Sequence, residues 1–146
     1  MTDAAAPIHD VIDRWHRFLR GDLPGGLDEL LHPDCVFYSP IVYTPQRGRD
    51  VTKMYLSAAG ATLGGTPKGE GGGGSFGYRT EVVSGHTAVL EFETTVEGKY
   101  VNGVDIITCD DDGKITEFRV MIRPLQAVNL VHQQMAAMLE KMAPKG

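Results

Sequence analysis

Between Phe76 and Arg123 the sequence alternates apolar and polar residues with a period of two, and short turn sequences interrupt the alternation three times. A period of two is typical of β-strands that bury one face. The interruptions, at residues 84–86, 97–98 and 110–113, all contain glycine and are short enough to join neighbouring strands. The segment is therefore predicted to be a four-stranded antiparallel meander, which needs another layer to cover its apolar face.

If each turn contains only those residues, the turn lengths determine every cross-strand pair and show which residues share a face. One face then carries most of the large apolar residues, and Asp105 is its only charged residue. The predicted rows on this inner face are Thr80, Leu90, Asp105 and Phe118; Tyr78, Phe92, Gly103 and Val120; Phe76, Thr94, Val101 and Ile122; and Val82, Ala88, Ile107 and Thr116.

Amphipathic helices are predicted on both sides of the meander, because apolar residues there recur at intervals of three and four. Three of them precede it, over 8–20, around 27–31 and from Asp50 to Gly64, with a brief strand at 36–38. One follows it, at 125–142. The predicted fold class is α+β, with three N-terminal helices packed on a curved antiparallel β-sheet and a C-terminal helix.

Length and charge exclude several kinds of partner. A chain of 146 residues fits one domain, and a formal net charge of -5 gives no general attraction to nucleic acid or to anionic membranes. No stretch approaches the ~18 apolar residues of a membrane-spanning helix, and the N-terminus lacks the basic start and apolar run of a secretion signal. We therefore expect a cytoplasmic protein whose partners include neither nucleic acid nor a membrane.

The order of these elements resembles the fold of nuclear transport factor 2 and of the SnoaL-like polyketide cyclases. The matching pieces are Gly21-Asp22, the strand at 36–40 with the turn at 47–50, and the stretches 102–105, 112–115 and 123–124. The resemblance implies one SnoaL-like domain over 1–146, with a core over about 8–124 and a C-terminal helix over about 125–142. It also implies that sheet and helices form a cone that encloses a ligand pocket.

Enzymes with different reactions share this fold, so the fold alone does not supply a function. Ketosteroid isomerase places a carboxylate base just before the proline of the short strand, where this chain has Ser39. Limonene epoxide hydrolase needs an arginine two residues before an aspartate, where this chain has Gly103. The cyclases use a pocket aspartate as acid or base, and Asp105 lies in the corresponding strand.

Asp105 is the predicted catalytic residue, with Tyr78 as its partner. A carboxylate among apolar neighbours has a raised pKa, which suits a general acid or base near neutrality. We expect Asp105 to exchange a proton with a hydrophobic carbonyl or hydroxylated ligand, as in a cofactor-free lyase, isomerase or cyclase. Tyr78, Tyr38 and Tyr43 are the candidates to hydrogen-bond the ligand oxygen. Two alternatives stay open: a non-catalytic binding or interaction module, and a structural Asp105 bonded to a buried tyrosine, to Trp15 or to backbone donors.

Further residues are predicted to line a pocket for a small hydrophobic molecule. They are Trp15, Tyr38, Tyr43, Tyr55, Phe76, Leu90, Phe92, Gly103, Phe118, Val120 and Ile122. Gly103 is expected to leave a gap beside Phe92 and Val120, although inward aromatic residues are also common in plain cores. The glycine-rich stretch 64–75 is predicted to be a flexible flap over the mouth of the pocket.

Neither a cofactor nor a metal ion is expected, because the five histidines are scattered and form no ligand motif. Cys35 and Cys109 show no metal or redox spacing; we expect both to be reduced, while a disulfide between them stays open. A homodimer is predicted from the apolar residues of the outer sheet face and from the methionine-rich last helix. Those outer-face residues are Val89, Val104, Ile106 and Met121.

Overall fold

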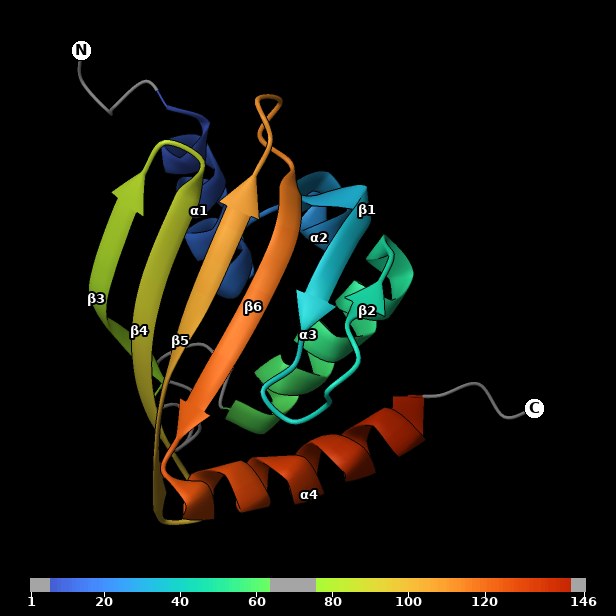
Figure 1. Ribbon diagram of the computed structural model, residues 1–146, viewed down its shortest axis with the longest axis vertical. Coiled ribbons are helices and arrows are strands. Elements are labelled where there is room, and N and C mark those ends of the chain that lie inside the picture. Colours follow the sequence, from blue (N-terminus) through green and yellow to red (C-terminus); the bar gives the residue numbers. More distant parts are fainter. Residues whose placement is uncertain (1–5, 64–75, 143–146) are drawn as a thin grey trace.

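The computed structural model describes residues 6–63 and 76–142 and shows helices packed on one curved sheet (Figure 1). Its elements are α1 (Pro7–Leu19), α2 (Gly26–Leu30), β1 (Leu31–Tyr38), β2 (Gln46–Arg47), α3 (Arg49–Leu63), β3 (Gly77–Ser84), β4 (Thr87–Val96), β5 (Lys99–Cys109), β6 (Ile115–Arg123) and α4 (Leu125–Met142). The predicted α+β class and the four-stranded meander are confirmed. The proposed flap at 64–75 lies outside the described residues.

The sheet has the strand order β2-β1-β6-β5-β4-β3. Strands β3 to β6 pair antiparallel with their sequence neighbours, but β1 pairs with β6 in parallel, so the sheet is mixed rather than wholly antiparallel. Strand β1 also begins earlier than predicted, at Leu31, directly after α2. Its pairing is irregular between Leu31 and Val36, around Pro33, which has no N–H to donate to a neighbouring strand.

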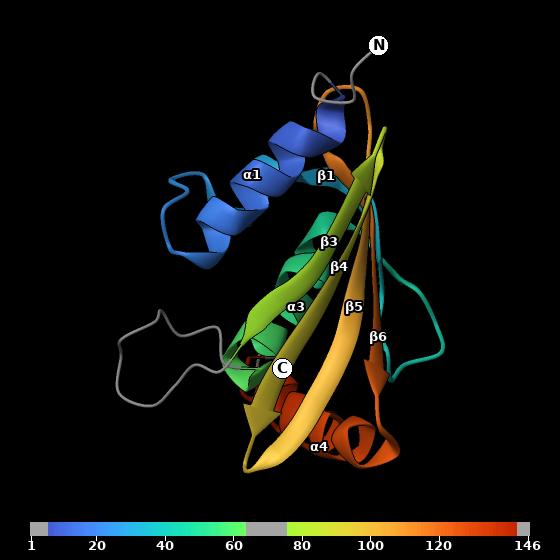
Figure 2. The same cartoon turned by 90° about the vertical axis from the view of Figure 1, so that its left-hand side faces the viewer.

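All the described helices lie on the concave side of the sheet (Figure 2). Helices α1 and α3 cross this side, and α4 closes the lower end, where it packs mainly on α3 and also contacts β5 and β6. Helix α4 therefore does not cover the outer sheet face. On the convex side Figure 2 shows only the segment between β1 and β2, so this face carries no helix from the described part of the chain.

The buried side chains form two clusters inside this shell. The first contains Trp15, Leu30 and Phe118 and fills the space between α1, α2 and the upper part of the sheet. The second contains Phe92 and Val131 and joins the lower part of the sheet to α4. Cys35 and Cys109 are buried free thiols. None of the described helices is long and apolar enough to cross a membrane.

The predicted register holds between β4 and β5, where Asp105 lies opposite Leu90 and Gly103 lies opposite Phe92. On its other side Asp105 pairs with Val120, two residues from the predicted partner Phe118. An irregularity between Thr108 and Cys109, next to the turn, takes up the extra residues. Because the shift is even, the same residues of β6 still face inward.

The hairpin between β3 and β4 is tighter than predicted, because its turn contains only Gly85 and His86. This shifts the nearby pairing by one residue, so Val82 is 58% exposed and Val83 packs on the core instead. Thr80 is exposed as well. A second irregularity, between Tyr78 and Thr80, restores the predicted pairing of Tyr78 with Phe92.

Candidate functional site

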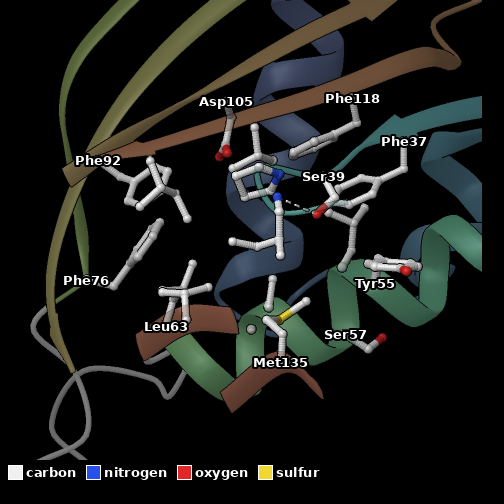
Figure 3. A pocket seen from close by; sticks show the side chains of 18 of the residues that line it. Phe37, Ser39, Tyr55, Ser57, Leu63, Phe76, Phe92, Asp105, Phe118 and Met135 are labelled. Atoms are coloured by element: carbon white, nitrogen blue, oxygen red, sulfur yellow. Dashed lines mark hydrogen bonds between the residues drawn. The ribbon is translucent and has the colours of Figure 1, made fainter. Parts of the chain in front are cut away.

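A cavity of about 370 Å³ lies on the concave side of the sheet, between it and helices α1, α3 and α4 (Figure 3). Most of the side chains predicted to line a pocket do lie on its wall. They are Trp15, Tyr55, Phe76, Tyr78, Phe92, Asp105, Phe118, Val120 and Ile122.

Four residues of the predicted pocket do not line this cavity. Tyr43 is fully exposed in the segment that follows β1. Tyr38 points to the outer side, where the guanidinium carbon of Arg119 lies 4.0 Å from its ring centroid. The alternation of side chains along β1 sends Phe37 into the cavity wall and Tyr38 away from it. Leu90 is buried in the upper cluster, in the core rather than at the cavity surface.

Gly103 is the fourth, and it leaves no gap. A Cβ atom at this position would lie 2.6 Å from Cζ of Phe92 and would collide with the backbone oxygen of Met121. The ring of Phe92 already occupies the space that the missing side chain leaves. The cavity therefore owes its volume to the distance between sheet and helices, and glycine is needed here so that Phe92 can pack on β5.

Asp105 projects into the cavity from the middle of β5 (Figure 3). Its backbone is held from both sides, by Leu90 on β4 and by Val120 on β6, so the direction of the side chain is set by the pleat of the sheet. The residue is only 6% exposed.

A chain of hydrogen bonds holds one oxygen of this carboxyl group. The indole Nε1 of Trp15 donates to the hydroxyl oxygen of Tyr78 at 2.9 Å. That hydroxyl in turn donates to Oδ2 of Asp105 at 2.7 Å. The other oxygen, Oδ1, has no hydrogen-bond partner among the described residues. This atom is not fully buried, so it is accessible from the cavity that Asp105 lines. Asp105 can therefore meet a ligand through Oδ1.

This geometry changes the role that we expected for Tyr78. A hydroxyl group has one proton to donate. The proton of Tyr78 goes to Asp105, so it does not serve a ligand oxygen while that bond is made. Tyr78 instead positions the carboxyl group.

Burial raises the pKa of Asp105 from its ordinary 3.8 to about 7, and the hydrogen bond from Tyr78 opposes this rise. Removing a carboxylate from water disfavours its charged form, whereas a donated hydrogen bond favours it. Burial, followed by the nearby Asp105, raises the pKa of Tyr78 well above its ordinary range. At neutral pH, therefore, Asp105 is divided between its acid and base forms while Tyr78 stays protonated.

Two pairs of packed aromatic rings form part of the cavity wall. Phe76 and Phe92 stack with their centroids 5.2 Å apart, and Trp15 packs on Phe118 at 5.1 Å. Such aromatic pairs contribute about 0.5–1.5 kcal/mol each beyond the burial of their surface.

Sequence reasoning predicted Tyr55 of α3, but it missed the polar lining residues from α3, α4 and the segment after β1. Polar lining residues from these parts are Ser39, Ser57 and His132. The sequence singles out Ser39 only because ketosteroid isomerase has a carboxylate base at that position. His132 follows Val131 on α4, but nothing in the sequence shows that this side of the helix faces a cavity. Within 6–63 and 76–142, no three histidine, cysteine or carboxylate side chains gather closely enough to hold a metal ion.

Comparison with known proteins identifies the family. Residues 10–118 match the SnoaL-like domain. No curated protein matches the chain. Among solved structures, a steroid delta-isomerase from Pseudomonas aeruginosa is 33% identical, with a TM-score of 0.81 and 94% of each chain covered.

Two further structures share the fold. An uncharacterised protein with a cystatin-like fold from Silicibacter pomeroyi is 29% identical, with a TM-score of 0.75, and the match covers 90% of this chain and 86% of that one. A putative SnoaL-like polyketide cyclase from Jannaschia is 15% identical, with a TM-score of 0.59, and the match covers 84% of this chain and 92% of that one. The family match over most of the chain and the 33% identical structure agree with the resemblance found in the sequence, and the protein belongs to the SnoaL-like domain family.

Proposed function

We propose that this protein is a cofactor-free isomerase, lyase or cyclase in which Asp105 transfers a proton to or from a small hydrophobic carbonyl or hydroxylated compound. One observation carries the proposal: the carboxyl group of Asp105 faces a mostly apolar cavity through a free oxygen, and burial raises its pKa to about 7. A group whose pKa lies near the working pH is present in both protonation states and passes a proton in either direction.

The chemistry follows from the two forms of Asp105. The ionised form takes a proton from the carbon next to a ligand carbonyl, and the electrons of that C–H bond move into the enolate. The neutral form returns a proton to the same carbon or to another one. The two steps balance without an oxidant or reductant. The apolar wall raises the basicity of the carboxylate, because the charged form is poorly solvated there.

The relatives support this class of reaction. The structure that is 33% identical is named a steroid delta-isomerase, and isomerisation is one of the reactions proposed here. The polyketide cyclase is too distant to support more than the shared fold. Ser39 has no proton-accepting carboxylate, so in this chain the transfers are assigned to Asp105.

Hydrogen exchange tests the proposal without knowledge of the natural substrate. The protein is incubated in heavy water with fused bicyclic ketones, and loss of the hydrogens beside the carbonyl is followed by NMR. We expect exchange that is faster than in buffer and that falls on the order of 100-fold or more in Asp105→Asn, the loss typical of a removed general base. Asp13→Asn, at an exposed carboxylate on α1, is the matched control and should leave the rate unchanged.

The competing function is a binding module that uses the same cavity without turnover. Tight binding of the ketones by the wild-type protein, with exchange no faster than in buffer, would favour that module. Equal exchange rates in the wild type and in Asp105→Asn would remove Asp105 from the mechanism.

A further inference from the structure

Ser39 lines the same cavity as Asp105, at the point where β1 ends (Figure 3). Its Oγ atom accepts two backbone hydrogen bonds, from the N–H of Ile41 at 3.0 Å and from the N–H of Val42 at 3.2 Å. These bonds hold the side chain in one orientation. Within the described part of the chain, no acceptor for the proton of this hydroxyl is found.

The Ser39 hydroxyl can form only one further kind of hydrogen bond. A serine hydroxyl has two lone pairs and one proton. Both lone pairs of Ser39 are engaged by backbone donors, so the group has only its proton to offer. Hydrogen bonds accepted by an oxygen also polarise its O–H bond and make it a better donor. A ligand group that meets Ser39 must therefore be an acceptor, such as a carbonyl, ether or hydroxyl oxygen.

The charges of the cavity lining determine whether the acceptor at Ser39 can be anionic. The lining contains no lysine or arginine, and it contains Asp105, which is partly ionised at neutral pH. An anionic ligand group would be poorly solvated in this apolar space and would be repelled by Asp105. The acceptor at Ser39 is therefore a neutral oxygen.

We infer that Ser39 is a second ligand-binding group, and that the cavity selects apolar compounds with two neutral oxygens, one that meets Oδ1 of Asp105 and one that accepts from Ser39. The inference rests on the proposed function for the first contact. Ser39 adds specificity rather than proton transfer, because its hydroxyl lacks the basicity for that step.

Two kinds of probe compound distinguish the ligand contact at Asp105 from the ligand contact at Ser39. The first is a fused bicyclic ketone with one oxygen, a decalone. The second is a set of decalindiones, which have the same carbon skeleton and differ in the position of the second oxygen. Trp15 is the only tryptophan of the chain and lies on the cavity wall, so its fluorescence reports binding directly.

In the wild-type protein we expect at least one dione to bind roughly fivefold more tightly than the decalone, the effect of about one neutral hydrogen bond. Ser39→Ala should lose this advantage and bind the decalone as the wild type does. Ser39→Thr keeps a hydroxyl that can accept from the same backbone N–H groups, and it should keep the advantage. Thermal melting of both variants checks that the cavity is intact.

An unchanged dione advantage in Ser39→Ala would overturn the inference, as would a wild-type protein that prefers no dione. Equal weakening of decalone and dione in Ser39→Ala would also overturn it, since that result assigns Ser39 to the backbone turn alone. These binding ratios require no turnover, so they stand or fall separately from the exchange rates of Asp105→Asn. Failure of every ketone to bind would remove both proposals.

Discussion

The hydroxyl of Tyr78 donates a 2.7 Å hydrogen bond to Oδ2 of Asp105, which joins the edge strand β3 to β5, two strands away in the sheet. Trp15 holds the same hydroxyl from α1. Helix and sheet therefore meet at the carboxyl group, and one of its oxygens is held while the other stays open to the cavity. This arrangement fixes the direction of the open oxygen before a ligand arrives, which is what proton transfer requires.

Tyr78→Phe should raise the pKa of Asp105 above its present value of about 7, because it removes the one hydrogen bond that opposes the effect of burial. Titration of the Asp105 carboxyl carbon by NMR measures this change. Any pH profile for ketone exchange should move to higher pH with it. Tyr100→Phe, which removes an exposed hydroxyl that bonds Glu93, should leave the midpoint unchanged. A lower midpoint in Tyr78→Phe would contradict our account of the site.

Asp105→Asn should stabilise the protein at neutral pH and above. Below about pH 4 both the native and the unfolded chain hold the Asp105 proton. Between about pH 4 and 7 the unfolded chain releases it while the native chain keeps it, so the wild type loses stability as the pH rises through this window. Above pH 7 the loss is complete, at most about 4 kcal/mol. Asparagine carries no charge and avoids this loss.

Urea unfolding of both proteins from pH 4 to pH 8 measures the effect. The difference in unfolding free energy should grow as the pH rises and level off above pH 7. Asp13→Asn again serves as the exposed control. A gap that stays constant with pH would show that Asp105 is ionised throughout, with an ordinary pKa.

Gly103→Ala should destabilise the protein by roughly 1–3 kcal/mol, the usual cost of adding a carbon to a filled core. The new Cβ would meet the ring of Phe92 and the backbone of Met121. Gly77→Ala is the matched control, because a Cβ there meets nothing within 4 Å. Urea unfolding of both variants provides the measurement. Equal stability of the two would mean that both the Phe92 ring and the backbone of β6 move aside freely, which would contradict the tight packing described here.

We also propose that the convex sheet face joins two copies of the chain. No described helix covers this face, and Val82, Tyr100 and Met121 are each about half exposed on it. Arginine and glutamate side chains surround these residues, so a second copy related by a two-fold axis can meet opposite charges. Light scattering should show a dimer that Met121→Glu converts to a monomer. Gln133→Glu, an equal charge change on α4, should leave the dimer intact, and a wild-type monomer at micromolar concentration would exclude the proposal.

The local alternation of residues and the lengths of the turns were sufficient to predict much of the fold. The alternation of apolar residues after Phe76 identified the meander, and the two-residue turn at 97–98 set the pairing of Asp105 with Leu90. The same alternation turned Asp105 inward as the only charge among apolar residues. These features depend on a side-chain period and a turn length, which neighbouring residues specify.

The sequence by itself thus determined which strands form and that a carboxylate lies inside. The tertiary structure decided which of the candidate partners bonds to it. Tyr78 donates to Asp105 and Trp15 donates to Tyr78, and these two partners, 63 residues apart in the chain, meet only when α1 packs on the sheet. The sequence also did not specify the irregularities beside Tyr78 and Cys109 or the exposure of Tyr43. A local period says which way a side chain points, whereas the contact that it makes there depends on every element that folds against it.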